Sequence, residues 1–192
     1  MSSRSLLTIA AVTVVGMIAI AIVLLRAPRV TSRATPHAAA AAPPPAAPAP
    51  SGRKIKARLF YVADDGMRLT GVERDIAYGE GATAQAREIV AAQIAPVVQP
   101  LVSAVPAGTA LRAVFLTDGG EAYVDLSREV VSAHPGGTLN ELLTIYTIVN
   151  ALTVNLPAVT AVQVLVDGKE VETLAGHIDL RQPLAKNLSW VQ

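Results

Sequence analysis

Apolar and polar positions divide the chain into stretches with different patterns. Leu6 to Leu25 is an unbroken run of twenty uncharged, mainly apolar residues. At about 1.5 Å per residue, a helix over this run is roughly 30 Å long, which matches the hydrocarbon core of a bilayer. Thr35 to Pro50 has six prolines and eight alanines in sixteen residues. This composition builds no core and favours an extended polyproline II conformation.

The apolar run predicts a retained membrane anchor. A cleaved signal peptide is the alternative, but its apolar core normally has only about 7–15 residues. The sequence Leu25-Arg26-Ala27-Pro28 is also a poor cleavage site. The predicted organisation is a short N-terminus (1–5), a transmembrane anchor (6–25), an Ala/Pro-rich stalk (26–52) and a folded domain (53–192).

Two features give opposite indications about the side of the membrane on which the domain lies. Arg4 precedes the apolar run, whereas Arg26, Arg29 and Arg33 follow it. This count alone places the C-terminal part in the cytoplasm. The short N-terminus and the stalk favour the opposite arrangement, because an extended stalk lifts a domain away from a membrane. We follow the stalk and predict a single-pass cell-membrane protein whose C-terminal domain is extracytoplasmic.

Within the domain, short strands alternate with turns. Ile55 to Tyr61 has a period of two, and a turn at 63–66 leads to a second strand near 67–78. The runs 111–117 and 121–126 flank Asp118-Gly119-Gly120 and predict a β-hairpin. A β-prone run at 162–166 ends in Asp167-Gly168, with a return strand near 170–174.

Two helices interrupt these strands. Thr83 is a possible N-cap for a helix that ends near Ala95, before Pro96. Thr138-Leu139-Asn140-Glu141 fits a capping box, and the helix after it runs to about Val154. The order β-β-α-β-β-α-β-β predicts an α+β fold. We expect a two-layer sandwich in which a mainly antiparallel sheet carries both helices on one face.

Charge and composition exclude several classes of protein. No acidic residue precedes Asp64, and the part from Arg53 onward holds twelve basic and fifteen acidic residues. A mildly acidic domain argues against nucleic-acid binding, which needs a clustered basic face. The chain has no cysteine, so disulfides, thiolate catalysis and lipid attachment at cysteine are excluded.

Few residues indicate chemistry. Gly79-Glu80-Gly81-Ala82-Thr83-Ala84 lies where a phosphate-binding loop belongs, but it fits only the permissive form of that motif, and Glu80 would repel phosphate. His177 with Asp179, or Asp125, could serve a hydrolase, although no G-x-S-x-G elbow accompanies them. We therefore predict no catalytic residues, no metal and no cofactor.

The second helix has more apolar surface than one sheet can cover. Leu139, Leu142, Leu143, Tyr146 and Val149 form one stripe. A second row, Ile145, Ile148 and Leu152, is displaced by about 120°. This row either packs against the first helix or forms a contact with a partner. Asn150 and Thr153 continue the inward stripe, and we expect them to be structural, with Asn150 tying the helix to a neighbouring strand or loop.

Four phrases in the domain resemble the GerMN domain of the sporulation and spore-germination family. They occur in order with matching spacing: Val105-Pro106-Ala107-Gly108-Thr109, Ala122-Tyr123-Val124-Asp125-Leu126-Ser127, Ile148-Val149-Asn150-Ala151-Leu152-Thr153 and Val162-Gln163-Val164-Leu165-Val166-Asp167-Gly168. The resemblance covers about Lys54 to Leu184. The chain departs from the family in lacking a lipoprotein cysteine and in having Ala151 where threonine is common.

The resemblance implies a non-catalytic, extracytoplasmic module. Family members are often lipoproteins or single-span proteins, and some support spore-envelope assembly or germination. We therefore expect a non-enzymatic binding or assembly module of the bacterial cell envelope. The resemblance also suggests a link to sporulation or germination. Its expected partners are the membrane and an envelope protein, with a homo-oligomer as one option and no nucleic acid. The alternative is an envelope hydrolase, or its accessory subunit, that uses His177, Asp179 or Asp125.

Overall fold

The computed structural model describes residues 52–192. The expected N-terminus, membrane anchor and nearly all of the stalk lie outside the described residues, so these expectations stay predictions. Within residues 52–192, no helix combines the length and the apolar character needed to cross a membrane.

The first sheet is a two-stranded antiparallel hairpin. Strand β1 (Lys54–Val62) pairs with β2 (Leu69–Ala77), so that Lys54 lies opposite Ala77. The connecting turn places Gly66 at φ 67°, a conformation that glycine adopts without strain. The side chain of Asp65 stabilises this turn by accepting a hydrogen bond from the backbone N–H of Met67. The hairpin agrees with the alternating pattern of the sequence.

The second sheet mixes antiparallel and parallel pairing. Strands β3 (Leu111–Leu116) and β4 (Glu121–Leu126) form the predicted hairpin. Strand β5 (Ala161–Val166) then pairs with β4 in parallel. Two short strands, β6 (Lys169–Glu170) and β7 (Leu184–Ala185), pair antiparallel with β5. The α+β class is confirmed, but the expected single sheet is divided in two.

Glycines begin both long helices. Gly81 precedes α2 (Ala82–Ile94) at φ 84°, and Gly137 precedes α4 (Thr138–Asn155) at φ 85°, and neither helix has a side-chain cap. The predicted Thr83 cap and Thr138–Glu141 capping box are therefore wrong. Both threonines lie one or two positions inside the helix, where the hydroxyl no longer faces the free N–H groups of the first turn. The sequence did not indicate the short helix α3 (Glu129–Ser132).

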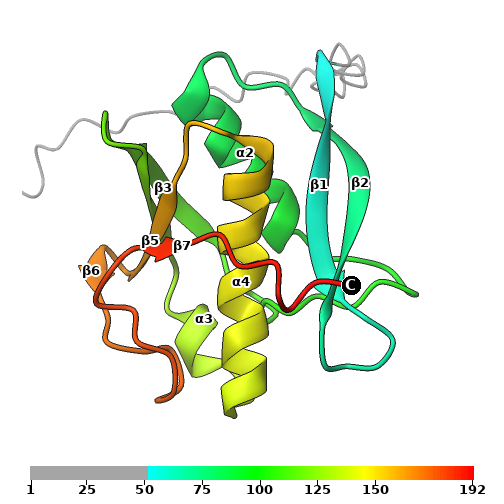
Figure 1. Ribbon diagram of the computed structural model, residues 1–192, viewed down its shortest axis with the longest axis vertical. Helices are drawn as coiled ribbons and strands as arrows, with labels where there is room; N and C mark the ends of the chain where they lie inside the picture. Colours follow the sequence, from blue (N-terminus) through cyan, green and yellow to red (C-terminus); the bar gives the residue numbers. More distant parts are fainter. Residues whose placement is uncertain (1–51) are drawn as a thin grey trace, which may run out of the picture. The chain divides into compact units, whose positions relative to one another are not determined.

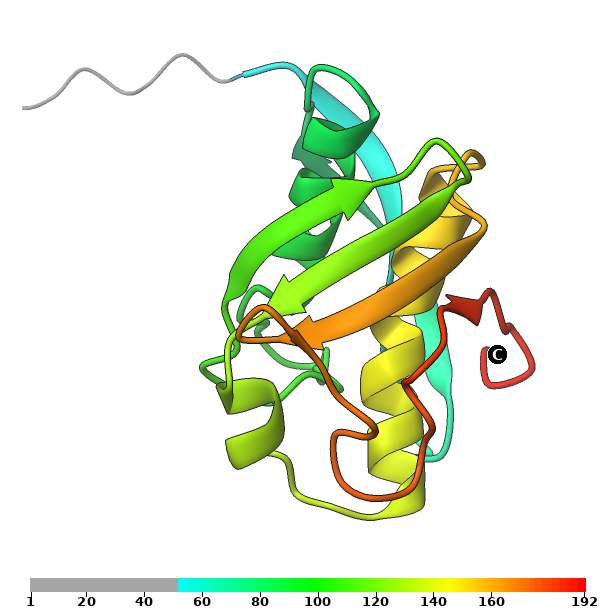
Figure 2. The ribbon, with the colours of Figure 1, turned by 90° about the vertical axis from the view of Figure 1, so that its left-hand side faces the viewer.

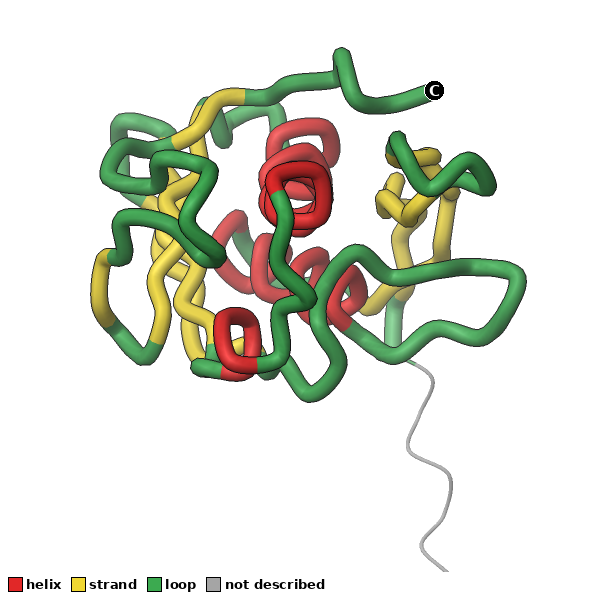
Figure 3. Tube along the Cα trace, turned by 90° about the horizontal axis from the view of Figure 1, so that it is seen from below, coloured by secondary structure: helices red, strands yellow, loops and turns green. Residues whose placement is uncertain are grey.

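The helices lie between the two sheets. In Figures 1 and 3, α2 and α4 separate the β1–β2 hairpin from the β3–β4–β5 sheet. Helix α4 contacts β1 and β5, and α2 contacts β1 and β3. The expected two-layer sandwich is thus a three-layer arrangement. The parallel β4–β5 pair requires a crossover connection, which α4 provides, and the first hairpin covers the opposite side of the helices.

Helix α4 is buried on almost all sides. Ile145, Ile148 and Leu152 are at most 1% exposed, and α4 packs against α2. These three residues therefore belong to the core, and the hypothesis that they contact a partner is wrong. Their burial and the contact between α4 and α2 agree with the alternative that this row packs against the first helix. The polar residues Thr144 and Thr147 of α4 are buried as well.

Side-chain amides of the helices bond to the free edge of β1. Gln93 of α2 donates to the carbonyl of Phe60 (2.7 Å) and accepts from its N–H (2.8 Å). The side-chain amide of Asn155 in α4 likewise donates to the carbonyl of Arg58 and accepts from its N–H, both at 2.8 Å. Thr147 also donates to the Phe60 carbonyl, at 3.0 Å. These side chains supply the hydrogen bonds that a neighbouring strand would make.

Asn150 makes the same kind of bond to the C-terminal segment. Its amide donates to the carbonyl of Asn187 (2.8 Å) and accepts from the N–H of that residue (3.0 Å). Asn150 is fully buried, and its ties to a loop are those of a structural polar residue. Thr153 donates to the carbonyl of Val149 within its own helix, at 2.7 Å. The side chains of Asn150 and Thr153 therefore both form hydrogen bonds to the backbone of the domain itself.

Replacing Gln93 with methionine tests the amide bonds. Methionine fills a similar volume, so the main loss is polar. Thr147 still serves the Phe60 carbonyl, but the Phe60 N–H becomes an unpaired buried donor, and we expect a loss of about 1–3 kcal/mol in the free energy of unfolding. Urea denaturation measures this loss. Gln182→Met, at an exposed position, is the control and should change stability by less than about 0.5 kcal/mol. Equal stability of the two variants would contradict the role of Gln93.

Candidate binding surface

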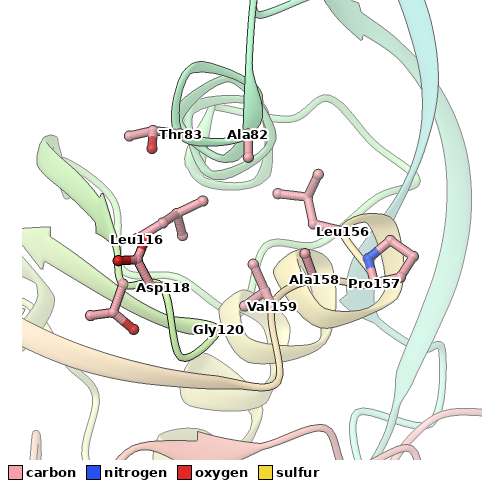
Figure 4. A pocket seen from close by; sticks show the side chains of 10 residues that line it. Ala82, Thr83, Leu116, Asp118, Gly120, Leu156, Pro157, Ala158 and Val159 are labelled. Carbon is pink, nitrogen blue, oxygen red and sulfur yellow. The ribbon is translucent and has the colours of Figure 1, made fainter.

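A pocket of about 360 Å³ lies at the start of α2. Figure 4 shows its walls: the first residues of α2, the β3–β4 turn and the connection from α4 to β5. Its lining is mainly apolar and includes the carboxylate of Asp118 but no basic residue. Packing and backbone conformation explain the two glycines of the 79–84 motif. A Cβ on Gly79 would lie 2.4 Å from the backbone of Ala84, and Gly81 has a positive φ. A phosphate group finds little complementary charge here.

A larger groove of about 630 Å³ follows the connection between α2 and β3. Residues 94–109 form nearly all of its wall, with Pro135 from the loop before α4. Its lining has no charged residue, and Val98 and Val102 on the same connection are exposed. The Val105–Thr109 phrase of the family resemblance lies in this wall.

The three residues considered for a hydrolase have separate partners. Asp125 accepts hydrogen bonds from Arg112 (3.0 Å) and from the backbone N–H of Gly168 (2.7 Å). Asp179 pairs with Arg181 at the surface, and the hydrogen bonds from Arg181 hold the pKa of Asp179 at about 2. His177 lies 3.1 Å from a different carboxylate, Glu141. These contacts do not bring the three groups together as a catalytic set.

Glu141 is the most deeply buried charged group of the domain. It is 0% exposed and accepts hydrogen bonds from the backbone N–H groups of Leu174, Ala175 and His177, at 2.8–3.0 Å. Burial raises the pKa of Glu141, but these hydrogen bonds and the one from the His177 ring outweigh it and hold the pKa below the usual value. Glu141 therefore anchors the 174–177 loop to α4. Sequence reasoning assigned it to a capping box and missed this role.

His134 links three segments through a fixed tautomer. Thr144 donates its one hydroxyl proton to the carbonyl of Ala104 (2.6 Å), so it accepts from His134 Nε2 (3.3 Å). His134 Nδ1 accepts the N–H of Gly136 at 3.0 Å. Burial lowers the pKa of His134, which agrees with a neutral ring. The residue thereby ties the loop before α4 to the wall of the groove.

Glu141→Gln tests the anchor role of the buried carboxylate. Because the pKa of Glu141 is lower in the folded than in the unfolded protein, its stabilisation is present above the usual value of 4.5 and is lost as the pH falls through the folded-state pKa. At pH 7 we expect the variant to lose about 1.5–3 kcal/mol in the free energy of unfolding. The difference should shrink at pH 3.5, because the carboxyl group of the unfolded chain, with its usual pKa of 4.5, is mostly protonated there.

Denaturation midpoints at the two pH values measure this effect. Glu80→Gln, at an exposed position, is the control. A loss for Glu141→Gln that is the same at both pH values would contradict an ionised anchor.

The solvent side of the larger sheet, which we call the outer face, carries apolar groups. Figure 2 looks onto this face, with α2 and α4 behind it. Residues directly opposite in the register share a face, so Phe115 and Tyr123 lie side by side. Phe115 is 58% exposed, whereas Val114 and Val124 point inward and are buried. A solvated sheet face is normally polar, whereas here a large aromatic side chain is exposed among the polar residues.

The C-terminal segment covers only one side of the outer face. Gln163 on β5 lies opposite Tyr123 but is buried. Its amide donates a hydrogen bond to the carbonyl of Leu180, which belongs to the C-terminal segment. The β3–β4 side, with Phe115 and the half-buried Tyr123, stays open to solvent. Negative charge from Glu121, whose carboxylate lies 3.4 Å from the Tyr123 hydroxyl, raises the pKa of Tyr123. The result is an aromatic pair beside a carboxylate.

Sequence reasoning did not find the outer face. The run Leu111-Arg112-Ala113-Val114-Phe115-Leu116 has apolar residues on both faces of the strand, which is typical of a strand that something covers. That signal was present, but it did not show which face points outward. The register with β4 settles this, because Val114 and Val124 together join the core.

Comparisons with known proteins agree with the fold. The model of the Germane family, described as sporulation and spore germination, matches residues 58–172. No curated protein matches the chain. A candidate lipoprotein from Clostridium perfringens has a similar structure, with a TM-score of 0.50 and 23% identity, over 69% of this chain and 88% of that one.

The tandem GerMN domains of the sporulation protein GerM from Bacillus subtilis are also similar. The TM-score is 0.54 and the identity 16%, over 69% of this chain. The match spans 46% of the tandem protein, which is less than half of its length.

Proposed function

Because the chain belongs to the Germane family of sporulation and spore germination, we propose that it is a non-enzymatic binding or assembly module of the cell envelope. The family match bears out the GerMN resemblance of the sequence. The proposed location is the extracytoplasmic side of the cell membrane, with the Leu6–Leu25 run as a single-pass anchor and the Ala/Pro-rich stretch as a stalk. The likeness in fold to a candidate lipoprotein supports an envelope setting.

The outer face of the larger sheet is the observation that carries this proposal. Phe115 is a large exposed side chain on a regular strand, and its neighbour across the hairpin is Tyr123. Aromatic side chains are enriched in protein interfaces because each gives a large contact area at a small cost in conformational entropy. Helix α4 has no comparable surface, since it is buried between the sheets.

A pair of fusions tests the location. A C-terminal alkaline phosphatase fusion to the full chain should be active, since that enzyme needs the oxidising space outside the cytoplasm. A C-terminal green fluorescent protein fusion, exported in the unfolded state, should stay dark. An inactive phosphatase together with a fluorescent partner fusion would show that the domain is cytoplasmic, and the envelope proposal would be wrong.

Photocrosslinking tests the contact surface. We expect p-benzoylphenylalanine at position 115 of the full-length protein to give a discrete crosslinked product in intact cells. The control places it at Lys56, whose side chain is 73% exposed on the other sheet and should give little product. Products from position 56 but not from position 115 would move the binding surface to the other sheet. No product from position 115 would remove the outer face from the proposal.

A further inference from the structure

The charges of the outer face are predominantly acidic. Three carboxylates share this face with the aromatic pair. Asp125 and Glu170 lie in one cross-strand row, because Leu165 pairs with both, and Glu121 lies opposite Ala161 in the row on the other side of the aromatic pair. The Asp125 carboxylate pairs with the guanidinium of Arg112, which lies at the irregularity between Leu111 and Ala113.

Arg112 does not neutralise the whole face. It lies 3.0 Å from Asp125 and 3.4 Å from Asp167, so one guanidinium serves two carboxylates. Asp125 is further satisfied by the N–H of Gly168 and is nearly buried. This group is therefore a closed structural network and offers little to a ligand.

Glu121 and Glu170 remain available. Neither forms an ion pair within residues 52–192, in contrast to Asp125. Both act on Tyr123, since the negative charge of each raises the pKa of its hydroxyl, Glu121 more strongly. Two unpaired carboxylates therefore flank an aromatic surface whose other member, Phe115, is open to solvent.

From this arrangement, and resting on the proposed function, we infer that the outer face binds a basic, partly apolar segment of another protein. The aliphatic stem of lysine or arginine packs on aromatic rings while its charged head reaches a carboxylate. Phe115 and Tyr123 supply the rings, and Glu121 and Glu170 supply the carboxylates. Complementary charge also steers such a partner to the face.

The same charges disfavour other occupants. A symmetric pair of copies would bring two acidic outer faces together, and like charges across an interface are unfavourable. Membrane surfaces and nucleic acids carry negative charge, so the carboxylates repel them as well. A positively charged polypeptide is the occupant that the face complements.

Charge-neutralising variants test this inference in the full-length protein, with p-benzoylphenylalanine at position 115 in its native membranes. We expect Glu121→Gln combined with Glu170→Gln to lower the yield of the crosslinked product by about fivefold or more, since each exposed charge pair contributes roughly two- to fivefold. Raising the salt concentration should lower the wild-type yield in the same direction. Glu73→Gln combined with Asp75→Asn, on the other sheet, is the matched control and should leave the yield unchanged.

Mass spectrometry of the product gives the second readout. The crosslinked peptide should come from another protein and contain lysine or arginine close to the attachment point. A yield that neither the Glu121/Glu170 pair nor salt changes would overturn the inference while the proposed binding function stands. A product with a second copy of this chain, or with lipid or glycan, would overturn it too. Failure to obtain any product at position 115 would remove both the inference and the surface on which it rests.

Discussion

Peptide groups at the free edge of β1 are hydrogen-bonded by side-chain amides rather than by another strand. Gln93 bonds both polar groups of Phe60, and Asn155 does the same for Arg58. An unpaired buried peptide group costs about 1–3 kcal/mol, so the amide of Gln93 stabilises the packing of the first hairpin against the helices. Asn150 forms the same pair of hydrogen bonds with the backbone of Asn187 in the C-terminal segment. The helix layer thus binds backbone on more than one side.

This constraint determines which surfaces are left for function. With a sheet on either side, α4 has no free apolar face, and Ile145, Ile148 and Leu152 join the core. The deeply buried Glu141 is occupied in holding the 174–177 loop. Large apolar side chains reach solvent instead on the connection before β3 and on the outer face, where Phe115 lies on a rigid strand. An interface built on such a scaffold needs little ordering of the free protein before it binds.

The sequence predicted local elements better than their assembly. The β3–β4 hairpin and helix α4 were found because turn glycines and apolar periodicity are local signals. Pairing of β4 with β5 is a contact between segments about forty residues apart, and no local pattern reports whether it is parallel. The capping box failed for a related reason. Glutamate is a usual residue at this position of a capping box, but the carboxylate of Glu141 instead accepts hydrogen bonds from the distant 174–177 loop.

Buried polar residues show the same limit. Asn150 attracted attention because it interrupts an apolar stripe, whereas Gln93 and Asn155 lie near helix ends, where polar residues are ordinary. Their roles depend on the position of β1, more than thirty residues away in each case. The aromatic pair on the outer face likewise depends on register. Family resemblance gave the fold, but it did not identify these contacts.

Native-state hydrogen exchange of the full-length protein measures most directly whether the amides join the first hairpin to the rest. If they do, the N–H of Phe60, bonded to Gln93, should open only with global unfolding and show the same exchange free energy as the N–H of Val124 in the central strand β4. In Gln93→Met, the exchange free energy of the Phe60 N–H should fall further than that of Val124. An opening of the wild-type β1 edge at a clearly lower free energy than β4, unchanged by the substitution, would contradict the account.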